Sequence, residues 1–109
     1  MDKRDKILLQ KILDEANIIA KLVEGFDCDS FVADEKTKRA TCMTLINIGE
    51  LVKLLSSETR QQNPDVPWRS IAGLRDVAVH GYMTLRMEDI WETVSVSLPT
   101  LKAQIDTIL

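Results

Sequence analysis

The sequence has few of the side chains that build metal and redox sites: one histidine and two cysteines in 109 residues. Cys28 and Cys42 are not part of a CxxC pair, and there is no second histidine, so a zinc site is not expected. Cys42 falls within a helical pattern, which predicts a small buried hydrophobic side chain. Cys28 is expected to be a free thiol in a loop.

Glycine and proline are also scarce, with four and three residues, too few for a sandwich or barrel with many tight turns. No apolar run approaches the roughly 20 residues of a membrane-spanning helix. The first ten residues, MDKRDKILLQ, carry charges of both signs and do not resemble a signal peptide. We therefore expect a cytoplasmic protein with no membrane partner, folded as a single domain over residues 1–109.

Only one part of the chain carries a net positive charge. The net charge of −3 argues against a general nucleic-acid binder, which is usually strongly basic. Residues 66–87, however, carry three arginines against one aspartate, whereas the segments on either side are neutral or acidic. This distribution favours a phosphate-bearing partner at residues 66–87.

Apolar residues at helical spacing predict an all-α protein. The first helix is expected from Asp2 to about Glu24, with Gly25 ending it. A short helical turn then follows, for which Asp29 or Ser30 is the expected N-cap.

The next predicted helix is long, with Asp34 as its N-cap and an end near Gln62, before Asn63-Pro64. Its middle is apolar on nearly every side, so it must be covered from two directions. In a chain of this size, a second subunit could provide one of those covers.

Two further helices complete the prediction. Pro67 is expected at the first position of a short helix that ends at Gly81. The last helix starts near Met87 or Glu88, and Pro99 within it is expected to kink it or weaken one turn. The predicted fold is an up-down bundle of four to five helices.

The chain's only histidine and only tyrosine both lie in the stretch LRDVAVHGYMTLR. On an ideal helix, Arg75 and His80 would point about 140° apart. Both can reach one phosphate if the helix ends or deforms near His80, which Gly81 would allow, or if the two groups come from two chains. Without a shared ligand, His80 would be a helix-end histidine favoured by the helix dipole and Tyr82 an aromatic at the bundle edge.

The run PWRSIAGLRDVAVHGY, with LINIGELVKLL before it and IWETVSVSLPTLKAQI after it, resembles the HepT-like branch of the HEPN superfamily. These are small helical toxins paired with minimal nucleotidyltransferase antitoxins in prokaryotes. The resemblance covers nearly the whole chain. The pattern of this branch, Arg-x4-His-x-Tyr, falls on Arg75, His80 and Tyr82.

The resemblance implies a HEPN-like fold and a metal-independent endoribonuclease with no cofactor. It implies a homodimer in which the two motifs face each other, with Arg75 and His80 as the catalytic residues and RNA as the substrate. The antitoxin would inhibit the enzyme by transferring AMP to Tyr82. A dimer also makes chemical sense, because one chain holds a single imidazole and the reaction needs both an acid and a base.

Two acidic residues leave alternatives open. Asp76 follows Arg75 where the family typically carries a polar residue, often asparagine; its carboxylate could neutralise Arg75 or orient His80. Glu50 could be a buried carboxylate at the dimer seam or a surface residue. If Asp76 abolishes cleavage, the alternative function is a non-catalytic helical binding subunit of a nucleotidyltransferase.

Overall fold

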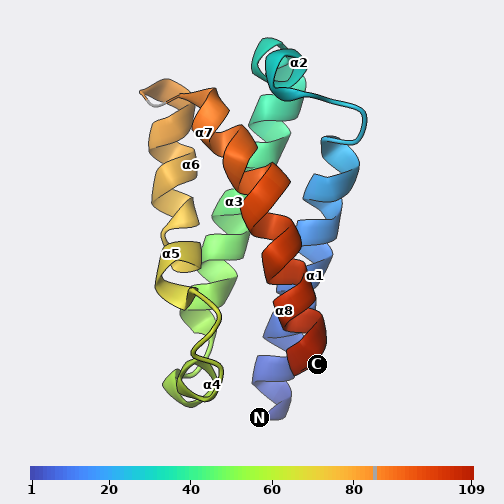
Figure 1. Ribbon diagram of the computed structural model, residues 1–109. Coiled ribbons are helices and arrows are strands. Elements are labelled where there is room, and N and C mark those ends of the chain that lie inside the picture. Colours follow the sequence, from blue (N-terminus) through green and yellow to red (C-terminus); the bar gives the residue numbers. More distant parts are fainter. Residues whose placement is uncertain (85) are drawn as a thin grey trace.

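The structure is a computed structural model that describes residues 1–84 and 86–109. All regular elements of these residues are helical, and four long rods stand side by side (Figure 1), which confirms the predicted all-α bundle. The rods are α1 (Lys3–Leu22), α3 (Glu35–Leu54), α6 (Leu74–Met83) with the short α5 (Trp68–Ala72) before it, and a last rod of α7 (Met87–Glu92), η1 (Thr93–Ser97) and α8 (Leu98–Ile108). The short α2 (Cys28–Ala33) and α4 (Ser57–Gln62) lie at opposite ends of the bundle, and both termini lie at the α4 end (Figure 1).

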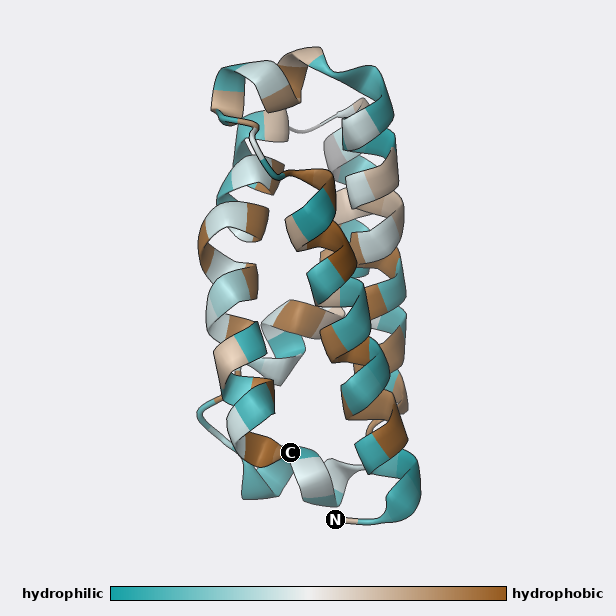
Figure 2. Ribbon diagram, turned by 90° about the vertical axis from the view of Figure 1, so that its right-hand side faces the viewer, coloured by the Kyte–Doolittle hydropathy of each residue, from teal (hydrophilic) through white to brown (hydrophobic). Residues whose placement is uncertain are grey.

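The core is formed by aliphatic side chains from every rod. Hydrophobic and hydrophilic residues alternate along the helices (Figure 2), as expected of amphipathic helices in a bundle. The side chains with no exposed surface include Leu9, Ile12, Leu45, Ile48, Ile90 and Ile105. Burying each such side chain contributes about 1.5–3 kcal/mol to folding.

Aspartates begin the first three helices. Helix α1 begins at Lys3, one residue after the predicted start, and Asp2 is its N-cap. Asp34 caps α3 as predicted, and its carboxylate accepts a bond from a backbone N–H. The cap of α2 was predicted wrongly. It is Asp27, because Ser30 is the third helical residue and returns a bond to the Asp27 backbone in a capping box.

Helix α1 ends at Leu22, with Val23 as its C-cap, slightly before the predicted end at Glu24 and Gly25. Gly25 lies in the turn that follows, where its φ of +81° favours glycine.

The long second helix does not run to Gln62 as predicted. It ends at Leu54, Leu55 is extended with ψ of 144°, and α4 starts after Ser56. The Ser56 side chain caps α4 by accepting a bond from the Thr59 backbone. The apolar pattern continues through the break, since Leu55 is buried, and periodicity alone therefore does not reveal it.

A buried carboxylate fixes this break from a distance. Asp5, on α1, is 1% exposed and accepts hydrogen bonds from the hydroxyls of Ser56 and Thr59. The Ser56 bond, followed by the Thr59 bond, lowers the pKa of Asp5 against the opposing effect of burial. This network ties the start of α1 to the start of α4.

The segment around the motif also differs from the prediction. Pro67 is the N-cap, one residue before the first helical position, and the predicted single helix is divided at Gly73 into α5 and α6. The helix does not end at Gly81 but continues to Met83.

In the last rod, Pro99 disturbs one turn as predicted. The turn just before it, η1, is a wider π-helical turn, because a wider turn relieves the clash of the proline ring with the preceding carbonyl.

The chain covers most of α3 itself. Helix α1 packs on one side of α3, and α5 and α6 pack on the other. A second subunit is therefore not needed to cover the whole apolar middle, contrary to that expectation. What stays uncovered is a narrow strip in which Met43 is 58% exposed and Ile46 is half-buried.

Both cysteines are free thiols. Cys42 is buried as predicted, and burial raises the pKa of its thiol. Cys28 is not in a loop but is the first residue of α2. Across residues 1–84 and 86–109, no helix is both long and apolar enough to cross a membrane.

Candidate functional site on helices α3 and α6

All three motif residues lie on one uninterrupted helix, α6. Arg75 and His80 therefore point about 140° apart and are about 7.5 Å apart along the helix axis. The expectation that the helix ends near His80 is wrong, and a deformed helix end does not bring them together. Within one chain, α6 thus directs the side chains of Arg75 and His80 to different sides.

Arg75 and Tyr82 are seven residues apart and share the side of α6 that faces α3. Between them, Ala78 is 1% exposed in the contact between the two helices. Each of the two motif residues meets a charged residue of α3: Arg75 meets Glu50, and Tyr82 meets Arg39. The candidate site thus has two ends, about eleven residues apart on α3.

Arg75 is held by two carboxylates. Its Nε atom lies 3.0 Å from Oε1 of Glu50, and its Nη1 atom lies 3.2 Å from Oδ1 of Asp76. The side chains of Arg75, Glu50 and Asp76 are 46%, 52% and 66% exposed, so Glu50 is a surface residue of this chain. Exposed ion pairs of this kind contribute about 0–1 kcal/mol each, and a phosphate can therefore compete for Arg75.

The His80 imidazole is exposed and forms no hydrogen bond with the described residues. Its backbone oxygen accepts bonds from the backbone N–H and the hydroxyl of Thr84, both at 2.7 Å, which fix the end of α6. Asp76 contacts Arg75 rather than His80. Of the two roles open to Asp76, this geometry favours partial neutralisation of Arg75.

Gly49 sets how closely α3 approaches α6. A Cβ atom at this position would lie 2.9 Å from the backbone N of Arg75 and 3.0 Å from the backbone O of Ala72. Only glycine permits such a backbone contact, and the contact brings Glu50, the next residue, beside Arg75. Sequence reasoning missed this role; the available signal was a glycine in the middle of a predicted helix.

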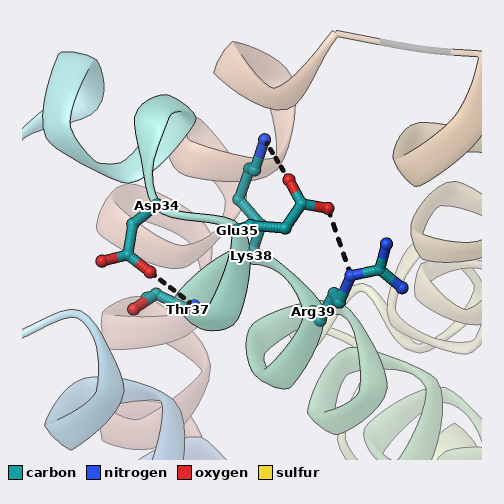
Figure 3. A network of polar contacts seen from close by, with 5 residues as sticks. All are labelled: Asp34, Glu35, Thr37, Lys38 and Arg39. Atoms are coloured by element: carbon teal, nitrogen blue, oxygen red, sulfur yellow. Dashed lines mark hydrogen bonds and ion pairs between the residues drawn. The ribbon is translucent and has the colours of Figure 1, made fainter.

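At the other end, the guanidinium carbon of Arg39 lies 4.6 Å from the centroid of the Tyr82 ring, a cation–π contact. The Nε atom of Arg39 also lies 3.1 Å from Oε1 of Glu35 (Figure 3). Arg39 was not predicted as a site residue, because no motif surrounds it and only the packing of α3 against α6 brings it to Tyr82.

A shallow hollow of about 280 Å³ lies at the Arg39–Tyr82 end, on the outer side of α3 and α6. Three of its side chains are well exposed although they are apolar: Met43 at 58%, Val79 at 45% and Met83 at 78%. Large exposed apolar side chains that cluster in this way are typical of interaction surfaces. We call these three residues the apolar patch.

The residues that the structure describes include no group of three or more histidine, cysteine, aspartate or glutamate side chains placed to hold a metal ion. The polar groups available at the site are thus one imidazole, two guanidinium groups, a phenol and three carboxylates. Guanidinium groups bind phosphate oxygens with matched geometry, and an imidazole exchanges protons near neutral pH.

Comparison with known proteins gives a consistent result. The sequence matches the family described as Ribonuclease HepT-like over residues 12–108. It is 37% identical over 107 residues to a protein of Caldanaerobacter subterraneus subsp. tengcongensis named as a candidate RNase, with 98% of this chain and 96% of that protein covered. No solved structure matches the chain significantly.

Two further relatives are similar over most of their length. A Methanocaldococcus jannaschii protein, also named as a candidate RNase, is 34% identical over 110 residues, covering all of this chain and 91% of that protein. A Thermococcus cleftensis protein with the name Probable ribonuclease HepT is 28% identical over 108 residues, covering 99% of this chain and 98% of that protein. Together with the match over residues 12–108, these similarities establish that the chain belongs to the HepT-like ribonuclease family.

Proposed function

We propose that this protein is an endoribonuclease that cleaves RNA without a metal ion, and that it does so as a homodimer whose two motifs form one site. The observation that carries the proposal is the placement of Arg75 and His80 on different sides of an unbroken helix, with the exposed Val79 and Met83 between them around that helix. Family membership and the ribonuclease names of the relatives support RNA as the substrate.

The apolar patch is the face by which two copies would pair. On α6, Val79 projects about 40° from Arg75 and about 100° from His80, so it lies between the two functional side chains. In a twofold interface each residue of the patch meets the same patch on the other copy. Pairing through Val79 and Met83 would bring Arg75 and His80 of both copies to the edges of one groove.

The reaction follows from the groups so assembled. The 2′-hydroxyl of the RNA attacks the adjacent phosphorus, the bond from phosphorus to the 5′-oxygen breaks, and a 2′,3′-cyclic phosphate and a 5′-hydroxyl form. One His80 accepts the proton of the 2′-hydroxyl, and His80 of the other copy gives a proton to the leaving 5′-oxygen. Arg75 stabilises the negative charge on the non-bridging oxygens of the pentacoordinate phosphorus.

We further propose that a minimal nucleotidyltransferase antitoxin inhibits the enzyme through Tyr82. The phenol oxygen attacks the α-phosphorus of ATP, pyrophosphate leaves, the phenolic proton passes to a base of the antitoxin, and AMP stays esterified to Tyr82. Within the described residues the Tyr82 hydroxyl forms no hydrogen bond, which supports its availability. The added phosphate and base would block the groove by charge and bulk.

A second function is favoured by one observation, the engagement of Arg75 with two carboxylates. If these hold the guanidinium too firmly for RNA to displace them, the protein would be a non-catalytic helical subunit that binds a nucleotidyltransferase. Cleavage by the unaltered protein separates this function from the first.

The test replaces the only imidazole. His80→Ala should reduce RNA cleavage by about 100-fold or more, because it removes both the acid and the base, while circular dichroism stays unchanged. Val77→Ala is the matched control, since Val77 is also exposed, lies one turn before His80 on the same helix and has no group that can transfer a proton; its rate should match that of the parent. A His80→Ala protein that cleaves as fast as the parent would contradict the proposal.

A further inference from the structure

Arg39 is an arginine outside the motif that the packing of α3 against α6 brings to Tyr82. It extends from the first turns of α3 and is 66% exposed, yet its guanidinium lies over the Tyr82 ring at 4.6 Å. Long charged side chains at such exposed positions usually sample many rotamers. Here two contacts hold the guanidinium in one place, the aromatic ring and Glu35.

The second contact leaves part of the guanidinium available. Glu35 approaches only the Nε atom of Arg39, at 3.1 Å, and the two Nη atoms point away from the carboxylate (Figure 3). No hydrogen bond or ion pair of the described residues involves these Nη atoms. They are the paired donors with which arginine binds phosphate oxygens.

The charge around Arg39 is not balanced. Glu35 is shared, because its Oε2 atom also lies 3.1 Å from Nζ of Lys38 (Figure 3). One carboxylate therefore faces two cations, and one positive charge is left over. Lys38 is only 16% exposed, so the exposed Arg39 is the cation that a ligand would reach first.

We propose that Arg39 is a phosphate-binding residue for a phosphodiester located at Tyr82, and that Glu35 is a positioning residue that holds the guanidinium over the ring. This inference rests on the proposed function and adds a cation from a different helix to the motif. The phosphodiester has two possible sources with the same chemistry: the AMP esterified to Tyr82, or an RNA segment that passes along α3 and α6. In both cases the phosphate lies beside the phenol oxygen, within the fork of the Nη atoms.

One arm of the experiment measures RNA binding without cleavage. Arg39→Gln and the control Lys36→Gln are each made in the His80→Ala protein, and the affinity for a single-stranded RNA is measured over a range of salt concentrations. Lys36 is on the same helix, is exposed and forms no ion pair with the described residues. If RNA is the source, Arg39→Gln weakens binding about tenfold and lowers the slope of log K against log salt by about 0.7, whereas Lys36→Gln changes neither.

The other arm measures the effect of AMP. The parent and Arg39→Gln, with intact His80, are incubated with a minimal nucleotidyltransferase and ATP, and modification of Tyr82 is followed by intact mass, with Tyr82→Phe as the unmodified control. If AMP is the source, modification raises the Tm of the parent by about 2 °C or more, and this gain is lost in Arg39→Gln. A purely structural role of Arg39 would change both forms equally. Arg39→Lys should restore part of the effect in whichever arm responds.

The proposal is overturned if Arg39→Gln matches the parent in both arms, or if the parent shows neither salt-dependent RNA binding nor modification of Tyr82. Failure of the proposed function would give a different result, because RNA cleavage would then not depend on His80. The binding arm uses a protein without His80, so the two outcomes are read separately.

Discussion

Glu50 of α3 and Arg75 of α6 form an ion pair in which Oε1 of Glu50 lies 3.0 Å from Nε of Arg75. The arginine of the motif is therefore oriented by a different helix before any ligand arrives. Asp76 contacts the same guanidinium through Nη1, so a phosphate must compete with two carboxylates. The two carboxylates thus both orient Arg75 and compete with a phosphate for it, and the effect of a substitution depends on which of these two roles it removes.

Removing the charge of Asp76 should strengthen RNA binding. In Asp76→Asn, Arg75 keeps its bond to Glu50 and loses a competing negative charge, so we expect KM to fall by up to about fivefold, in line with the small energy of an exposed pair. Glu58→Gln, an exposed carboxylate on α4, is the control and should leave KM unchanged. A lower kcat in Asp76→Asn would show instead that Asp76 orients His80.

Gly49→Ala should disturb both stability and the site. The added Cβ would lie 2.9 Å from backbone N of Arg75, and neither backbone can move freely. We expect the free energy of unfolding to fall by about 1–3 kcal/mol in urea titrations, with a loss of cleavage because Arg75 is displaced from Glu50.

Gly73→Ala is the matched control for this substitution. Its φ is −71°, and a Cβ there would lie 3.3 Å from its nearest neighbour, the backbone O of Ser70. Gly73→Ala should therefore lower the free energy of unfolding much less than Gly49→Ala does, and it should leave cleavage intact. Equal effects of the two substitutions would show that the contact at Gly49 is not tight.

Asp5 should make stability depend on acidic pH. Hydrogen bonds from Ser56 and then Thr59 hold its pKa below the ordinary value of 3.8, so the folded state favours the carboxylate. That contribution is complete above the unfolded pKa and is lost as pH falls through the lower, folded pKa. Asp5→Ala should lower the free energy of unfolding by about 1–3 kcal/mol at pH 7 and flatten its decline below about pH 4. If the free energy of unfolding declined equally with falling pH in the parent and in Asp5→Ala, this role of Asp5 would be contradicted.

The apolar patch should control association. Val79→Glu places a charge at the centre of the proposed interface, and light scattering should detect a shift from dimer to monomer, because burying an unpaired carboxylate is unfavourable. Val96→Glu is the control, because Val96 is 60% exposed on η1, away from the patch. A Val79→Glu protein that stays dimeric would exclude this face as the interface.

The local features of the fold were readable from the sequence, whereas features that depend on distant contacts were not. The cap at Asp34 was predicted because a cap acts on its own helix. The break at Leu55 was missed because the carboxylate that stabilises it, Asp5, is 51 residues from Ser56. The continuation of α6 past Gly81 was missed because glycine ends a helix only where packing allows.

In the candidate site, too, local features were predicted from the sequence and features that depend on distant contacts were not. Arg75, His80 and Tyr82 were found together because one motif contains them. Glu50 was noticed, but its pairing with Arg75 and the contact of Arg39 with Tyr82 depend on the register of α3 against α6. That register is set where the backbone of Arg75 meets Gly49, and no periodicity reports it.

The most direct test of the shared site is cleavage by a mixed dimer. One parent subunit and one His80→Ala subunit carry different affinity tags, the mixed dimer is purified through both tags, and its RNA cleavage is compared with that of the parent dimer. If each reaction uses both imidazoles, the mixed dimer should have less than about a tenth of the parent rate. A rate of about half would mean that each chain works alone, and would contradict a site formed from two copies.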